Sequence, residues 1–168
     1  MSRDAAGRTF RAGILTVSDM GARGEREDTS GAAIRELLEP AGFTVERYEI
    51  IPDEAAQISE RLSAWCDAGL ELIVTTGGTG LGPRDVTPQA TLAVLDYEAP
   101  GIAEAMRAEG LKHTAMSMIG RGVAGVRGRT LIVNLPGSPK GVRESLAVVL
   151  PALPHALELL RGERSEHG

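Results

Sequence analysis

Aromatic residues are scarce in this chain, and basic residues are not in excess. Phe, Trp and Tyr make up 3% of the 168 residues, and 18 Lys and Arg stand against 23 Asp and Glu, a net charge of −5. Single-stranded nucleic acids are commonly bound by stacking on exposed aromatic side chains, and duplexes by concentrated basic residues. Both modes are disfavoured, so we expect no nucleic-acid partner.

Cysteine is almost absent as well. Cys66 stands alone, so no disulfide framework exists, which indicates a reducing compartment. The histidines, at positions 113, 155 and 167, lack the spacing of metal ligands, which disfavours a zinc site. No apolar run approaches the roughly 20 residues of a membrane-spanning helix, and residues 1–11 lack the apolar centre of a signal peptide. We therefore expect no membrane partner and a cytoplasmic location.

Two widespread catalytic or nucleotide-binding motifs are also missing. The chain has no G-x-x-x-x-G-K-[ST] loop and no G-x-S-x-G elbow. Gly120–Gly125 formally matches the dinucleotide pattern G-x-G-x-x-G, but that pattern requires a helix directly after it. A strand is predicted after it instead, so we interpret the match as fortuitous.

Glycine, in contrast, is abundant, with 21 residues, and the hydrophobic content of 42% is ordinary for a globular protein. The length predicts one domain over residues 1–168, with flexible ends at 1–10 and 162–168. Apolar runs alternate with amphipathic stretches, which predicts an α/β fold with a parallel sheet covered on both faces. The expected strands are 11–18, 43–51, 72–74 and 130–133, and the expected helices are 29–39, 55–67, 89–97, 100–111 and 139–160, the last bent or split at Pro151 and Pro154. In segment 114–128, Met116, Met118 and Ile119 could form a short helix or a strand, and the pattern leaves both open.

One stretch, Leu72–Thr91, combines a buried strand, a glycine loop and a helix start. After the strand the chain reads TTGGTG over residues 75–80, and glycine at that density lets backbone N–H groups face a ligand. Asp85 follows, and Thr87 with Pro88 predicts an N-cap and a proline in the first turn. Amides and a helix N-terminus can hold an anion together, so this order predicts a phosphate-binding loop. The alternative is a glycine turn that only reverses the chain.

Four segments follow expected strands: Ser18-Asp19, Asp53, Thr76–Asp85 and Asn134–Ser138. Because the carboxyl ends of parallel strands share one edge of the sheet, and ligands bind there, we expect these segments to converge on one site.

We expect Asp53 and Asp85 to be the carboxylates that take part in the reaction. Two acids beside bound phosphates are the usual ligands of Mg²⁺, which neutralises charge during phosphoryl or nucleotidyl transfer. Each acid also has a purely structural alternative. Asp53 could be the N-cap of the helix at 55–67, and Asp85 could be an ion-pair partner of Arg84.

Three stretches, TTGGTGLGPRDVTPQAT, NLPGSPKGVRE and VSD…GEREDTSG, resemble the molybdopterin adenylyltransferase family, which includes the MogA and MoaB proteins and domains of gephyrin. The resemblance covers residues 11–162. It implies a three-layer sandwich around a mostly parallel sheet, usually in a homotrimer. It also implies a role in molybdenum cofactor biosynthesis, namely Mg²⁺-dependent transfer of AMP from ATP to the terminal phosphate of molybdopterin with release of pyrophosphate. The product could then be handed to a molybdenum-insertion protein.

The resemblance also assigns roles to residues. The acids of the family's PDE and PRD motifs fall on Asp53 and Asp85, which implies catalysis and Mg²⁺ binding there. Gln89 stands where the family commonly carries Glu. The alternative function is a protein that binds and presents molybdopterin without catalysis. The substrate-binding residues implied are Ser18, Asp19, Thr76, Gly77, Gly78, Thr79, Gly80, Asn134, Pro136, Gly137, Ser138 and Pro139.

Overall fold

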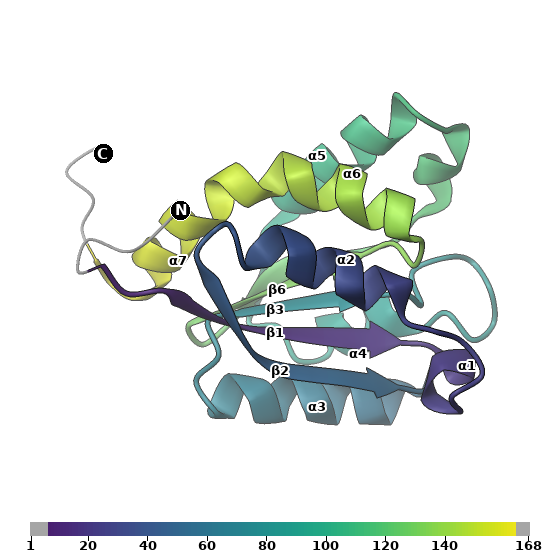
Figure 1. Ribbon diagram of the computed structural model, residues 1–168, viewed down its shortest axis with the longest axis horizontal. Coiled ribbons are helices and arrows are strands. Elements are labelled where there is room, and N and C mark those ends of the chain that lie inside the picture. The colour runs from purple at the N-terminus through teal and green to yellow at the C-terminus, as the bar shows by residue number, and fades with distance from the viewer. Residues whose placement is uncertain (1–6, 164–168) are drawn as a thin grey trace.

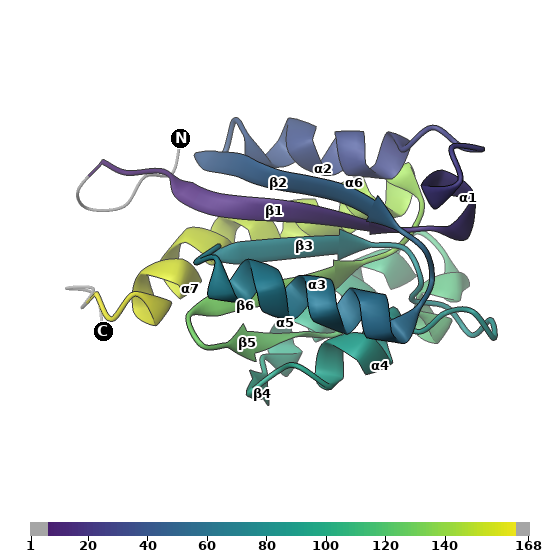
Figure 2. The same ribbon diagram turned by 90° about the horizontal axis from the view of Figure 1, so that it is seen from below.

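A six-stranded sheet forms the middle layer of the computed structural model, which describes residues 7–163. The strand order is β2-β1-β3-β6-β5-β4, and Figure 2 shows the strands in this order. The first four strands in this order are parallel, and β5 and β4 run antiparallel to their neighbours. The strands are β1 (Phe10–Val17), β2 (Phe43–Ile51), β3 (Leu72–Thr76), β4 (Tyr97–Glu98), β5 (Ala124–Arg127) and β6 (Thr130–Leu135).

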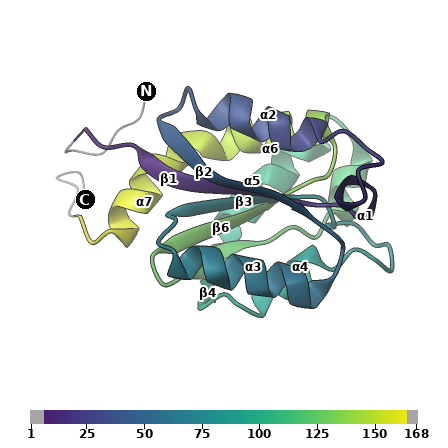
Figure 3. The same ribbon diagram turned by 60° about the horizontal axis from the view of Figure 1, so that its bottom comes forward.

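Helices cover both faces of the sheet. Helices α2, α5, α6 and α7 lie on one face, and α3 and α4 lie on the other (Figures 1 and 3). A small helix, α1, lies at one end of the sheet. The bounds are α1 (Asp19–Ala22), α2 (Thr29–Leu38), α3 (Ala55–Asp67), α4 (Thr87–Leu92), α5 (Pro100–Leu111), α6 (Pro139–Val149) and α7 (Leu153–Leu160), with 3₁₀ turns η1 (Ala115–Ile119) and η2 (Leu150–Ala152).

The central strands β1, β3 and β6 are almost entirely buried because both of their faces are covered. Successive side chains of a strand point to opposite faces, so Leu72 and Val74 pack under α2 and α6 while Ile73 packs against Ile58 and Leu62 of α3. All five residues of β3 are buried. The predicted α/β class, with helices on both faces of a mostly parallel sheet, is therefore confirmed.

Three local predictions were wrong or incomplete. The helix expected at 89–97 ends at Leu92, and Tyr97 instead pairs with Val126 in the antiparallel β4–β5 ladder. Met116, Met118 and Ile119, left open between helix and strand, lie in the 3₁₀ turn η1, and the strand β5 that follows was not predicted. Thr87 is the first residue of α4 and not its N-cap, which is Val86.

Other local predictions were confirmed. Strand β5 begins within the stretch Gly120–Gly125, so this stretch does not open a helix. The final helical segment is divided by η2 at the expected prolines. Of the ends expected to be flexible, residues 1–6 and 164–168 lie outside the described residues, while Phe10 begins β1 and is fully buried. Within residues 7–163, no helix has the length and apolarity needed to span a membrane.

Candidate active site

The carboxyl ends of β1, β2, β3 and β6 meet at one edge of the sheet, next to α1 (Figures 1 and 2). A cavity of about 730 Å³ opens there, which is within the usual range of small-molecule sites. We call it the acidic cavity, because its lining includes four carboxylates. It is lined by Thr16, Val17, Ser18, Gly21, Arg26, Glu27, Asp28, Thr29, Ser30, Asp53, Thr76, Gly77, Gly78, Asp85, Gly137, Ser138 and Pro139.

Gly77 and Gly78, in the loop after β3, lie too close to neighbouring atoms to carry a side chain. Gly77 has a φ of 94°, and a Cβ on it would lie 2.3 Å from the carbonyl oxygen of Val17. Gly78 has a φ of 68°, and a Cβ there would lie 2.3 Å from Oγ1 of Thr87. Only glycine satisfies both the backbone angle and the space. The loop is thereby held against the ends of β1 and α4.

Backbone donors in this loop remain available for a ligand. The N–H of Gly77 donates to the carbonyl of Leu135 at 3.3 Å. Within the described chain, the N–H groups of Gly78, Thr79 and Gly80 donate to no protein acceptor. Successive unpaired N–H groups of this kind form an anion-binding concavity. Of the three, Gly78 lines the acidic cavity, so the loop is suited to a phosphate there through the amide of Gly78 and not through that of Gly77.

Asp53 and Asp19 hold each other through reciprocal bonds. The N–H of Asp19 donates to Oδ2 of Asp53 at 2.9 Å, and the N–H of Asp53 donates to Oδ1 of Asp19 at 3.0 Å. Arg84 donates to both carboxylate oxygens of Asp19 and to Glu54, and its guanidinium lowers the pKa of Asp19. These contacts tie the ends of β1 and β2 to the loop after β3.

Both structural alternatives for the two acids were wrong. The N-cap of α3 is Glu54, without a side-chain cap bond, so Asp53 does not cap that helix. Arg84 pairs with Asp19 and Glu54 and not with Asp85. Asp85 accepts a bond from the N–H of Gly82 at 2.9 Å and faces the acidic cavity.

The acids of the cavity carry an electrostatic cost. Burial raises the pKa of Asp53, and the nearby charges of Asp19 and Asp85 raise it further. A bound cation would offset that cost, because it favours the charged form of a carboxylate. Arg26 is the one cationic side chain among the described residues that line the cavity.

The donor set fits Mg²⁺ better than a metal held by protein alone. Oδ1 of Asp53 and Oδ1 of Asp85 accept no hydrogen bond within residues 7–163, which leaves one oxygen of each acid for a ligand. No cluster of three or more His, Cys, Asp or Glu side chains suited to a metal occurs in that range. Mg²⁺ typically takes one or two carboxylates and completes its shell with phosphate oxygens and water.

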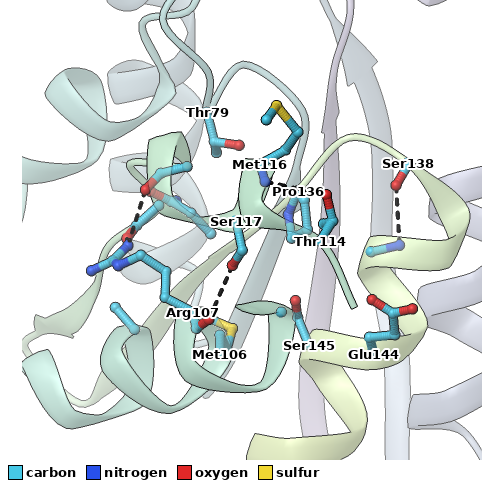
Figure 4. Close-up of a pocket in the computed structure, with 16 residues that line it drawn as sticks. Thr79, Met106, Arg107, Thr114, Met116, Ser117, Pro136, Ser138, Glu144 and Ser145 are labelled. Atoms are coloured by element: carbon cyan, nitrogen blue, oxygen red, sulfur yellow. Dashed lines mark hydrogen bonds between the residues drawn. The ribbon is translucent and has the colours of Figure 1, made fainter. Parts of the chain in front are cut away.

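A second cavity, of about 240 Å³, lies next to the first and shares Ser138 with it. We call it the apolar cavity, because Ala103 and Met106 of α5, together with Met116 and Pro136, form much of its wall (Figure 4). Its polar lining includes Thr79, Arg107, Thr114, Ser117, Asn134, Glu144 and Ser145.

The predicted substrate-binding residues are divided between the two cavities. Ser18, Thr76, Gly77, Gly78, Gly137, Ser138 and Pro139 line the acidic cavity, and Thr79, Asn134, Pro136 and again Ser138 line the apolar cavity. Asp19 and Gly80 line neither of these two cavities.

Two polar side chains that were predicted to bind substrate form hydrogen bonds within the protein. Asn134 is 1% exposed, and its amide donates to the hydroxyls of Thr75 and Thr91 and accepts from the N–H of Val123. Thr76 donates to the carbonyl of Pro136 at 2.7 Å. These two residues shape the edge of the sheet, because their polar atoms already have protein partners.

The predicted site residues include none from residues 23–30, which cover the loop between α1 and α2 and the start of α2. Asp28 caps α2 by accepting from the N–H of Gly31, and it also accepts from the hydroxyls of Thr16 and Tyr48. Ser30 donates to the carbonyl of Gly137 at 2.6 Å. The stretch GEREDTSG contains part of this loop, and its polar density was the signal available.

The chain is thus an α/β protein in which a glycine loop with unpaired amides and two acids, at the carboxyl edge of a mostly parallel sheet, form a site suited to an anion and a metal. Residues 13–155 match the family described as "Probable molybdopterin binding domain". The chain belongs to this family, as its sequence motifs predicted.

Curated and solved relatives agree with this assignment. The molybdopterin adenylyltransferase of Helicobacter pylori J99 is 43% identical over 160 residues, which cover 92% of this chain and 89% of the relative. That of Escherichia coli K12 is 38% identical, covering 92% and 87%. The structure of the molybdopterin biosynthesis enzyme MoaB from Thermus thermophilus has a TM-score of 0.88 at 62% identity, covering 92% of this chain and 98% of that one. A MogA structure has a TM-score of 0.86 at 45% identity, covering 89% and 99%.

Proposed function

We propose that this protein transfers AMP from ATP to the terminal phosphate of molybdopterin and releases pyrophosphate, in a Mg²⁺-dependent reaction. The observation that carries the proposal is the pair Asp53 and Asp85, from separate strand ends, facing one cavity beside unpaired loop amides. The names of the curated relatives support the same reaction class.

The two cavities suggest how the substrates divide. Phosphates suit the acidic cavity, where the amide of Gly78 and the cation of Arg26 can neutralise charge. The apolar cavity suits one of the flat ring systems, which can contact Met106 and Met116. Ser138, which lines both cavities, then lies between the ring and the reacting phosphates.

The proposed reaction is a substitution at the α-phosphorus of ATP and needs no oxidant or reductant. An oxygen of the molybdopterin phosphate attacks the α-phosphorus of ATP, the bond from that phosphorus to the bridging oxygen breaks, and pyrophosphate leaves with the electron pair. A magnesium ion held by Asp53, Asp85 and phosphate oxygens would neutralise the charge that accumulates in this step. The loop amide of Gly78 holds a phosphate in place, and such positioning supplies most of the catalysis in this reaction class.

The deciding experiment measures pyrophosphate release from purified protein mixed with molybdopterin, ATP and Mg²⁺. Asp85→Ala should keep the fold and lower turnover by about 100-fold or more, the magnitude typical for loss of one electrostatic group at a reaction centre. Asp67→Asn, at an exposed position at the end of α3, is the matched control and should retain full turnover. Unchanged turnover in Asp85→Ala would refute the assignment.

A binding protein that presents molybdopterin without catalysis is the second candidate. It is favoured by one observation: the description of the matching family names molybdopterin binding and no reaction. This candidate predicts tight molybdopterin binding with no pyrophosphate release under the same conditions.

The oligomeric state of the protein, the delivery of its product and its cellular location are further proposals. Leu81, Met116 and Met118 are 66%, 63% and 70% exposed, and exposed apolar side chains of this kind commonly mark an interface. They support the predicted homotrimer, which light scattering coupled to size-exclusion chromatography would test. Delivery of the product to a molybdenum-insertion protein and a cytoplasmic location stay predictions.

A further inference from the structure

The guanidinium of Arg121 joins both ends of the loop that contains Asp85. Nε donates to the carbonyl of Gly80 at 2.8 Å, and Nη2 donates to the carbonyl of Asp85 at 2.8 Å. Nη1 donates to Oε1 of Gln89, in α4, at 3.2 Å. One planar group therefore fixes the distance between the two ends of the loop and anchors them to the helix that follows.

The loop so held determines the direction of the Asp85 carboxylate. Between Gly80 and Asp85, the N–H of Asp85 donates to the carbonyl of Gly82, and Oδ2 of Asp85 accepts from the N–H of Gly82. A Cβ on Gly80 or Gly82 would lie 2.9 or 2.8 Å from that Oδ2. The carboxylate therefore lies against the loop's own backbone, so a shift of either loop end would move its oxygens.

The segment that contributes Arg121 is itself braced. The N–H of Arg121 donates to the carbonyl of Thr79 at 2.9 Å. From α5, Arg107 donates to the carbonyl of Gly122 at 2.8 Å. The residues of the fortuitous G-x-G-x-x-G match thus form a support for the phosphate loop, which is a role unrelated to dinucleotide binding.

Arg121 lines neither the acidic nor the apolar cavity. Its guanidinium is directed at backbone carbonyls and at Gln89, so it does not serve as a ligand for substrate phosphate. We propose that Arg121 is a positioning residue that holds Asp85 in the geometry required for adenylyl transfer, an inference that rests on the proposed function. Gln89 supplies an acceptor for this guanidinium without adding a charge.

The test compares Arg121→Ala and Arg121→Lys with Arg127→Ala. Arg127 is a matched control, because it is also half-buried and donates to a backbone carbonyl, that of Val94 at 2.9 Å, away from the site. Arg121→Ala should lower kcat by about 10- to 100-fold with less change in the KM for ATP, since small misplacements of a reacting group cost that much. Lysine, a point charge, cannot span both carbonyls, so Arg121→Lys should also lose turnover.

Two readouts separate positioning from mere stability. Added guanidinium ion at millimolar concentration should restore part of the kcat of Arg121→Ala, whereas urea should not. Hydrogen–deuterium exchange of the peptide spanning residues 79–87 should rise in Arg121→Ala while the peptides of β1 and β3 keep their protection. If Arg121→Ala does not fold, Arg121→Lys provides the same comparison.

The outcomes are distinct. Unchanged kcat and unchanged loop exchange in both Arg121 variants, as in Arg127→Ala, would overturn the inference. Loss of kcat with protection lost across the whole chain and no rescue by guanidinium would also overturn it, since that pattern indicates a structural role only. If wild-type protein shows no pyrophosphate release, the proposed function fails, and loop exchange alone then decides whether Arg121 holds Asp85.

Discussion

Replacing Gly77 by alanine tests directly whether backbone contact shapes the phosphate loop. The residue has a φ of 94°, and the new Cβ would lie 2.3 Å from the carbonyl oxygen of Val17. Val17 ends a central strand that pairs with both β2 and β3, so its carbonyl cannot move away without disturbing the sheet. Gly128 is the matched control: its φ is 59°, and a Cβ there would meet no atom within 4 Å.

The expected magnitudes follow from these two differences. A positive φ costs alanine about 1–2 kcal/mol at either position. Only Gly77→Ala adds an overlap with fixed backbone, and overpacking of this kind typically costs about 1–3 kcal/mol more. Together these give about 2–5 kcal/mol for Gly77→Ala. For a chain of this length each kcal/mol lowers Tm by about 2–4 °C, so we expect Gly77→Ala to melt roughly 10 °C lower and Gly128→Ala about 4 °C lower.

Thermal melting followed by circular dichroism, at equal protein concentration, is the assay, because association makes Tm depend on concentration. Gly77→Ala should also lose pyrophosphate release, since the overlap moves the loop at Gly78. Equal Tm values for the two variants would refute the argument, because the close approach to Val17 would then impose no requirement for glycine.

Three more predictions follow from single residues. Thr87 has a buried hydroxyl without a hydrogen-bond partner in the described chain, so Thr87→Val should raise the unfolding free energy by about 1 kcal/mol in urea titration; a decrease would contradict this. Arg26→Ala should raise the KM for ATP several-fold, while Arg23→Ala, whose side chain pairs with Glu25 and does not line the acidic cavity, should not; equal KM values would exclude a phosphate contact. Burial and the bond to Asp28 raise the pKa of Tyr48. The pKa of Tyr48 in the folded chain is therefore above the unfolded value of about 10. The stabilisation that Tyr48 gives the fold is complete below about pH 10 and is lost as the pH rises above about 10. Tyr48→Phe should show a shallower fall of Tm as the pH rises above about 10, and an identical slope would count against the bond.

The architecture was predictable because its signals are local or repeat along the chain. Runs such as Leu72–Val74 identify buried strands, and a parallel sheet brings the ends of its strands to one edge. These two facts bring Asp53 and the loop of Asp85 to the same edge, whereas the direction of the Asp85 carboxylate depends on contacts of that loop. The end of α4 was not predictable in this way, because Tyr97 leaves the helical pattern to pair with Val126, a partner distant in sequence.

The finer contacts of the site depend on pairs that no local pattern reveals. Asp53 precedes a helix, and its position alone favoured a capping role, yet its carboxylate accepts from Asp19, 34 residues away. Arg121 lies in a stretch that matches an unrelated motif, and its contacts with Gly80 and Asp85 span 41 and 36 residues. Such pairings arise from the sheet order, so they become visible only once the strands are placed.

The contacts of Arg84 have a consequence for how the molecule loses activity. This side chain is 55% exposed. With Asp19 and Glu54 it links the segments that follow β1, β2 and β3 through ion pairs and not through apolar packing. Chaotropic salts weaken exposed ion pairs at lower concentrations than those that unfold a buried apolar core. As such a salt is added, loss of activity should therefore precede unfolding, so that the protein is already inactive while circular dichroism still shows intact helices.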